Sequence, residues 1–216
     1  MKKNIFLLFS LICTFALPLQ ISAEERPVTI LYLGDSLTEG FGIEPEEAYP
    51  ALVNTKLKEA GHLNIKTING GYSGSTTASA FSRLKWYSRV KPDIVVLALG
   101  ANDGLRGLPP EAMQTNLAKA IEFAQSKGIK VVLCGMQAPP NYGKEYTARF
   151  KEVYLTLTEE FGISLVPFLL NKVAGHPKMN LPDGIHPNQN GHRIIAETVY
   201  GHLFTVINSN RRNNKN

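Results

Sequence analysis

The chain has 216 residues, 44% of them hydrophobic and 19% charged, and a formal net charge of +5. This length and composition fit one domain with one sizeable core, since no biased linker or internal repeat divides the chain. Several of the basic residues lie at the two ends, as Lys2, Lys3, Arg211, Arg212 and Lys215, so the body is near neutral and no basic stripe indicates nucleic-acid binding.

The N-terminal segment has the layout of a secretory signal peptide. Two lysines precede an apolar stretch from Ile5 to Leu19, and small residues then precede acidic ones. The apolar stretch is shorter than the roughly 20 residues that a membrane-spanning helix needs. We therefore expect a signal peptide at 1–23, cleaved after Ala23, and a periplasmic or extracellular protein; the alternative is a retained N-terminal anchor. Cleavage would leave Cys134 as the only cysteine, which excludes an intramolecular disulfide.

The rest of the chain alternates between strand-like and helix-like segments. Five continuous apolar runs are typical of parallel strands buried on both faces: 28–33, 64–68, 93–99, 130–135 and 164–169. Helical spacing of apolar residues lies between and after them, near 49–60, 112–124, 143–162 and 191–207.

Parallel strands need crossover helices, so this alternation predicts a three-layer α/β/α sandwich. The sheet is expected to be parallel, five-stranded and doubly wound, in the flavodoxin-like order 2-1-3-4-5. The domain is expected to span 24–210, and a polar, disordered tail is expected at 211–216.

Four polar clusters lie after strands of this predicted sheet. They read GDSLTEG (34–40), NGGYSGSTT (69–77), GANDGLRG (100–107) and LPDGIHPNQNGH (181–192). The carboxyl ends of parallel strands meet at one edge, beside the switch point between the first and third strands. We therefore expect the four clusters to converge there.

The clusters contain the groups that ester hydrolysis needs. Ser36, at the end of a strand and the start of a helix, is the candidate nucleophile, and His186 is the candidate base. Asp183, three residues earlier on the same loop, is the candidate that orients the imidazole. Candidate oxyanion donors are the backbone N–H groups of Ser36 and Gly74 and the side-chain amide of Asn102. Each residue alone has an ordinary explanation in a turn or cap, so it is their joint occurrence that indicates a hydrolytic site.

Other polar residues have simpler interpretations. Asp35 is expected to bond backbone amides of its own turn, Asp103 to serve a turn or cap, and His192 to pack or lie at the surface. The chain offers no HxxxH motif or cysteine pair, so neither a metal nor a cofactor is expected. The first cluster also lacks the Lys and Ser or Thr of a phosphate-binding loop and the GxSxG elbow.

The four clusters resemble the four blocks of the SGNH, or GDSL, hydrolase family, from about the first strand to the last helix. In that family the matching positions serve as nucleophile, oxyanion donors, orienting acid and base, and the resemblance assigns those roles to the residues named above. The segments GANDGLRG, NYGKEY and DGIHPN are similar to members that hydrolyse acyl-CoA thioesters, lysophospholipids and aryl or short-chain esters. The resemblance also implies an open cleft near the third cluster, with four candidate acyl-binding residues: Leu105, Leu108, Met136 and Tyr142.

We therefore expect an exported, monomeric serine esterase or thioesterase that forms an acyl-enzyme on Ser36. Its partner would be a small-molecule acyl ester or thioester, with lysophospholipid among the candidates, and no nucleic acid or stable membrane anchor is expected. Two alternatives stay open. The first is a carbohydrate or peptidoglycan O-acetyl esterase on the same scaffold, and the second is a catalytically silent module that only binds an acyl or glycan ligand.

Overall fold

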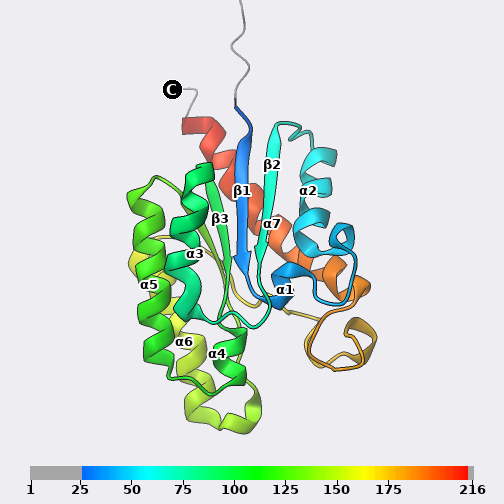
Figure 1. Cartoon of the computed structure of the whole chain (residues 1–216), viewed down its shortest axis with the longest axis vertical. Helices are drawn as coiled ribbons and strands as arrows, with labels where there is room; N and C mark the ends of the chain where they lie inside the picture. Colours follow the sequence, from blue (N-terminus) through cyan, green and yellow to red (C-terminus); the bar gives the residue numbers. More distant parts are fainter. Residues whose placement is uncertain (1–25, 214–216) are drawn as a thin grey trace, which may run out of the picture.

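The computed structural model describes residues 26–213, with side chains through 208. Its centre is a parallel sheet (Figure 1) of five strands: β1 (Val28–Gly34), β2 (Ile65–Gly71), β3 (Ile94–Ala98), β4 (Lys130–Cys134) and β5 (Ser164–Val166). The strand order is β2-β1-β3-β4-β5. The predicted doubly wound parallel sheet and its order are therefore confirmed.

The strands are continuously apolar because helices cover both faces of the sheet. All five residues of β3 are buried, and Cys134 at the end of β4 is a buried free cysteine, as expected. Strand β5 ends at Val166, three residues before the predicted boundary. The next residue, Pro167, has no N–H to give to the ladder.

The described residues form α-helices that are short at the strand ends and long on the two faces of the sheet. They are α1 (Ser36–Glu39), α2 (Tyr49–Glu59), α3 (Ala80–Tyr87), α4 (Ala101–Leu105), α5 (Pro110–Ser126), α6 (Lys144–Phe161) and α7 (Gln189–Asn213). Short 3₁₀ helices cover Pro45–Glu47, Thr77–Ser79, Ser88–Val90, Pro140–Tyr142 and Pro177–Met179. Helix α2 packs against α7, and α5 packs between α3 and α6 (Figure 1). Within 26–213 no helix combines the length and the apolar character that crossing a membrane requires.

Helix boundaries follow the expected signals, with two differences. Pro109 is the N-cap of α5, and Gly61 and Gly128 follow α2 and α5 with left-handed φ values of 83° and 70°. Helix α3 was not predicted: it is only eight residues long and buries only Ala80 and Leu84, although apolar residues at 80, 84 and 87 do share one helical face. Helix α7 includes residues 211–213, the first half of the expected tail. The expected signal peptide at 1–23 and residues 214–216 lie outside the described residues.

Two glycines let α1 fold back directly onto the carboxyl ends of the central strands. A Cβ at Gly34, the last residue of β1, would lie 1.9 Å from Thr38 Oγ1. A Cβ at Gly71, the last residue of β2, would lie 2.1 Å from the backbone nitrogen of Glu39. This close approach places Ser36, the first residue of α1, at the carboxyl end of β1, beside the switch point between β1 and β3.

Candidate active site

Ser36, His186 and Asp183 form one hydrogen-bonded series at the carboxyl edge of the sheet. His186 Nε2 lies 3.0 Å from Ser36 Oγ, and His186 Nδ1 lies 2.7 Å from Asp183 Oδ2. Ser36 begins α1, whereas the other two residues lie on the loop before α7. The structure thus brings together the three residues that the sequence analysis grouped.

The Asp183 carboxylate is fixed by the backbone of its own turn. Its Oδ1 accepts hydrogen bonds from the backbone N–H groups of Ile185 at 2.9 Å and His186 at 3.0 Å. The backbone and side-chain bonds from His186, followed by the bond from Ile185, lower the pKa of Asp183 to about 2. The carboxylate is therefore ionised at neutral pH and favours a proton on His186 Nδ1, which leaves Nε2 as an acceptor.

The start of α1 is organised by Asp35. This residue is the N-cap, and its buried side chain accepts a hydrogen bond from the Leu37 N–H at 3.0 Å, which confirms its expected role. Burial raises the pKa of Asp35 to about 6. Since Asp35 supplies the cap, the Ser36 hydroxyl stays available to His186.

The three candidate oxyanion donors, on Ser36, Gly74 and Asn102, line one cleft. Within residues 26–213, the backbone N–H groups of Ser36 and Gly74 donate to no hydrogen-bond acceptor. Asn102 Nδ2 donates to the Ser75 carbonyl at 3.0 Å, which fixes the amide, and lies 3.5 Å from Asp35 Oδ2. The three candidate donors therefore come from the segments after β1, β2 and β3 and line the same cleft.

The cleft has a volume of about 750 Å³ and a mainly apolar lining. Its lining residues follow all five strands, so it extends along the carboxyl edge of the sheet. His186 is the one titratable side chain among the described residues that line it. Apolar lining residues include Leu37, Phe41, Leu105, Met136, Phe168 and Leu170.

Only two of the four candidate acyl-binding residues line this cleft. Leu105 and Met136 do, whereas Leu108 and Tyr142 are not among the lining residues. The Tyr142 hydroxyl instead donates to the Leu105 carbonyl at 2.8 Å. The carbonyl of Leu108 accepts from the Tyr146 hydroxyl at 2.8 Å, so both residues contribute to the packing of the neighbouring loops.

The sequence analysis missed two residues that contact the site. The Phe41 ring packs on the His186 ring with centroids 4.5 Å apart, and its place directly after the first cluster was a usable signal. Arg83 of α3 donates to the Gly34 carbonyl and to Ser75 Oγ, both at 2.9 Å, and also to the Gly70 carbonyl. Nothing in the local sequence indicated these contacts of Arg83, because its helix was not predicted.

Two other polar residues have structural contacts. Asp103 is buried and accepts from the N–H and hydroxyl of Thr77 at 2.9 Å and 2.6 Å, which ties α4 to the loop after β2. His192 is buried, and its Nδ1 accepts from the Tyr49 N–H at 3.1 Å at the start of α2. Burial lowers the pKa of His192 to about 4, so the ring is neutral at neutral pH.

Among residues 26–213 no group of three His, Cys, Asp or Glu side chains is placed to hold a metal ion.

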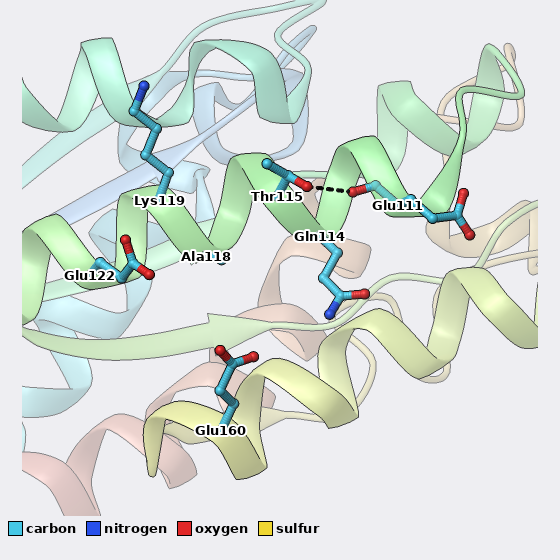
Figure 2. A pocket seen from close by; sticks show the side chains of 7 residues that line it. All are labelled: Glu111, Gln114, Thr115, Ala118, Lys119, Glu122 and Glu160. Carbon is cyan, nitrogen blue, oxygen red and sulfur yellow. Dashed lines mark hydrogen bonds between the residues drawn. The ribbon is translucent and has the colours of Figure 1, made fainter.

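A second hollow, of about 700 Å³, lies on the flank of the molecule. Figure 2 shows its mostly polar side chains on α5 and on the adjacent α6: Glu111, Gln114, Thr115, Ala118, Lys119, Glu122 and Glu160. The Thr115 hydroxyl is bonded to the Glu111 carbonyl at 2.9 Å. That bond commits the one hydroxyl among these lining residues to a backbone carbonyl rather than to a base, so the chemistry points to the cleft at the strand ends.

Comparisons with known proteins identify the family and support the fold. Residues 32–194 match the GDSL-like Lipase/Acylhydrolase family. The chain is 39% identical to an arylesterase of Vibrio mimicus, over 89% of this chain and 94% of the relative. It is 32% identical to thioesterase 1/protease 1/lysophospholipase L1 of Escherichia coli (strain K12), over 83% of this chain and 85% of that relative. A crystal structure of TesA superposes with a TM-score of 0.78 at 38% identity, covering 81% of this chain and 97% of that one.

Proposed function

The chain belongs to the GDSL-like lipase/acylhydrolase family, and we propose that it hydrolyses carboxylic esters and thioesters through an acyl-enzyme on Ser36. The observation that carries this proposal is the hydrogen-bonded series from Ser36 through His186 to Asp183. The arylesterase and the thioesterase 1/lysophospholipase L1 among its relatives support esters and thioesters as the substrate class.

Attack on the acyl group begins with proton transfer to His186. The ionised Asp183 keeps a proton on His186 Nδ1, so Nε2 accepts the proton of the Ser36 hydroxyl 3.0 Å away. As that proton leaves, Ser36 Oγ forms a bond to the acyl carbon. The carboxylate of Asp183 stabilises the resulting imidazolium.

The carbonyl oxygen of the substrate becomes an oxyanion in this step. We assign its stabilisation to the N–H groups of Ser36 and Gly74 and the amide of Asn102, because all three residues line the cleft. One such donor contributes about 3 to 4 kcal/mol of transition-state stabilisation. Because the donors are already held by the fold, little reorganisation accompanies the reaction.

The intermediate then collapses, and the proton on His186 Nε2 passes to the leaving alcohol or thiol. A water molecule next gives a proton to Nε2 and attacks the acyl-enzyme, forming a second tetrahedral intermediate. Its collapse returns the proton to Ser36 Oγ and releases the free carboxylic acid. The cycle consumes one water and needs no further reactant.

The size and lining of the cleft favour acyl chains longer than acetyl. Strands β1 and β5 are three positions apart in the sheet, about 14 Å at ordinary strand spacing. An apolar cleft along that edge supports a chain of several methylenes, including that of a lysophospholipid. A hydrolysis panel from acetyl to palmitoyl esters, with acyl-CoA and lysophospholipid, tests this. A peak at acetyl with little activity on longer chains would favour the O-acetyl esterase alternative.

Covalent labelling tests whether Ser36 reacts at all. A fluorophosphonate probe is attacked by an activated serine and leaves a stable phosphonyl group on Oγ. We expect labelling of the parent protein and none of Ser36→Ala. Complete absence of labelling in folded parent protein would instead support the catalytically silent binding module.

A further inference from the structure

We propose that Glu39 and Arg106 are positioning residues that hold the Gly74 N–H in place as an oxyanion donor. This inference rests on the proposed function of Ser36 and Gly74. The loop that carries Gly74 follows β2 and is exposed at residues 72–74, so hydrogen bonds rather than burial must fix its shape.

The first contact fixes the peptide between Tyr72 and Ser73, which precedes the Ser73–Gly74 peptide. Glu39 Oε2 accepts a hydrogen bond from the backbone N–H of Ser73 at 2.8 Å and a second from the Ser73 hydroxyl. Glu39 is the last residue of α1, the helix that Ser36 begins. A carboxylate on the nucleophile's own helix therefore holds the upstream side of the loop.

The second contact fixes the peptide between Gly74 and Ser75, which follows the Ser73–Gly74 peptide. The Arg106 guanidinium donates to the Gly74 carbonyl at 3.0 Å. Arg106 directly follows α4, the helix that contains Asn102. A cation from the segment that supplies another donor therefore holds the downstream side.

The peptide between the two contacts is the one whose N–H is uncommitted. Gly74 has a left-handed φ of 76°, and within residues 26–213 its N–H donates to no acceptor. Fixing the peptide units on both sides limits rotation of the central one, so its N–H stays directed at the cleft. Glu39 and Arg106 thus couple the position of the Gly74 donor to those of Ser36 and Asn102.

The next residue along the loop does not depend on these contacts. Ser75 is buried, its hydroxyl accepts from Arg83 at 2.9 Å, and its carbonyl accepts from Asn102 at 3.0 Å. The Tyr72 N–H donates to the Gly34 carbonyl and the Ser75 N–H to the Tyr72 carbonyl, both at 3.2 Å. Loss of Glu39 or Arg106 would therefore loosen the Ser73–Gly74 peptide while the rest of the loop stays anchored. The consequence is a misplaced donor in a protein that remains folded.

Steady-state kinetics with p-nitrophenyl butyrate test the proposal. Complete loss of one oxyanion donor lowers kcat about 10²- to 10³-fold. A donor that is only loosened should lose part of this contribution. We therefore expect kcat to fall about tenfold in Glu39→Ala and in Arg106→Met, with KM unchanged. Fluorophosphonate labelling of Ser36 should slow in parallel, because the phosphonyl oxygen occupies the same position. Glu39→Gln keeps an acceptor oxygen and Arg106→Lys keeps a donor, so both should recover most of kcat.

Matched controls come from exposed ion pairs away from the cleft, Glu197 with Lys56 and Arg149 with Glu111. Glu197→Ala and Arg149→Met should keep the parental kcat. Parental kcat in both Glu39→Ala and Arg106→Met, with Ser36→Ala inactive, would overturn the positioning role and leave the proposed function intact. Full activity of Ser36→Ala would instead overturn the proposed function. If kcat fell as far in Glu39→Gln as in Glu39→Ala, the role of the residue 39 side-chain oxygen as an acceptor would also be contradicted.

Discussion

His186 Nε2 lies 3.0 Å from Ser36 Oγ, although 150 positions separate the two residues in the chain. The contact exists because β1 delivers Ser36 to the switch point of the sheet, while the loop before α7 returns to the same edge. Phe41 packs on the imidazole and Asp183 bonds its other nitrogen, so the ring is held on two sides. Geometry of this kind predicts several measurable properties.

Replacing Asn102 should reduce turnover far more than stability. In Asn102→Ala the oxyanion loses one donor, and we expect kcat to fall about 10²- to 10³-fold. The folded protein loses the bond to the Ser75 carbonyl, which costs about 1 kcal/mol in unfolding free energy. Parallel kinetic and denaturation measurements check both numbers. Unchanged kcat in a folded variant would remove Asn102 from the oxyanion site.

The buried Asp35 should make the protein less stable as pH rises from about 4 to 6. Its folded-state pKa of about 6 exceeds the ordinary value of 3.8, so in this range the folded state binds the proton more tightly than the unfolded state. Relative to Asp35→Asn, the parent should lose up to about 3 kcal/mol of unfolding free energy across this window. Urea titrations of both proteins at several pH values measure the difference. If the difference in unfolding free energy between the parent and Asp35→Asn stayed constant with pH, the raised pKa of Asp35 would be contradicted.

His192 should produce the opposite slope. Its folded-state pKa of about 4 lies below the ordinary 6.5, so the unfolded state takes up the proton first as pH falls. Stability from the neutral ring is complete above pH 6.5 and decreases between 6.5 and 4. His192→Asn, which keeps an acceptor for the Tyr49 N–H, should show a smaller loss over that range. Equal acid sensitivity of parent and variant would contradict this assignment.

The segment at 1–23 should be removed on export. We propose that the exported protein starts at Glu24, because the small residues Ser22 and Ala23 follow the apolar stretch. N-terminal sequencing of protein recovered from the periplasm or medium of an expressing bacterium checks the site. An intact Met1 on membrane-associated protein would favour the retained anchor.

The sequence was most informative where one residue type has one structural consequence. Strands buried on both faces are continuously apolar, which made β1 to β4 recognisable within one residue of their starts. Gly61 and Gly128 marked helix ends because they adopt φ values that other residues rarely take. The series from Ser36 to His186 was foreseeable because its members follow strands that must share an edge.

The remaining features depend on contacts between distant side chains, which no local pattern encodes. Arg83 reaches the Gly34 carbonyl from a short helix that was not predicted. Leu108 and Tyr142 were expected in the cleft, but which face of a loop a residue presents depends on the packing of neighbouring loops. The contact of Glu39 with Ser73 likewise exists only once α1 lies on the end of β2.

Hydrolysis of a p-nitrophenyl ester by Ser36→Ala tests the central claim most directly. The variant removes one hydroxyl from the edge of an apolar cleft, so circular dichroism and the midpoint of thermal unfolding should match the parent. We expect kcat to fall at least about 10³-fold, because both half-reactions require that oxygen. A folded Ser36→Ala variant that cleaves the ester at the parental rate would contradict it.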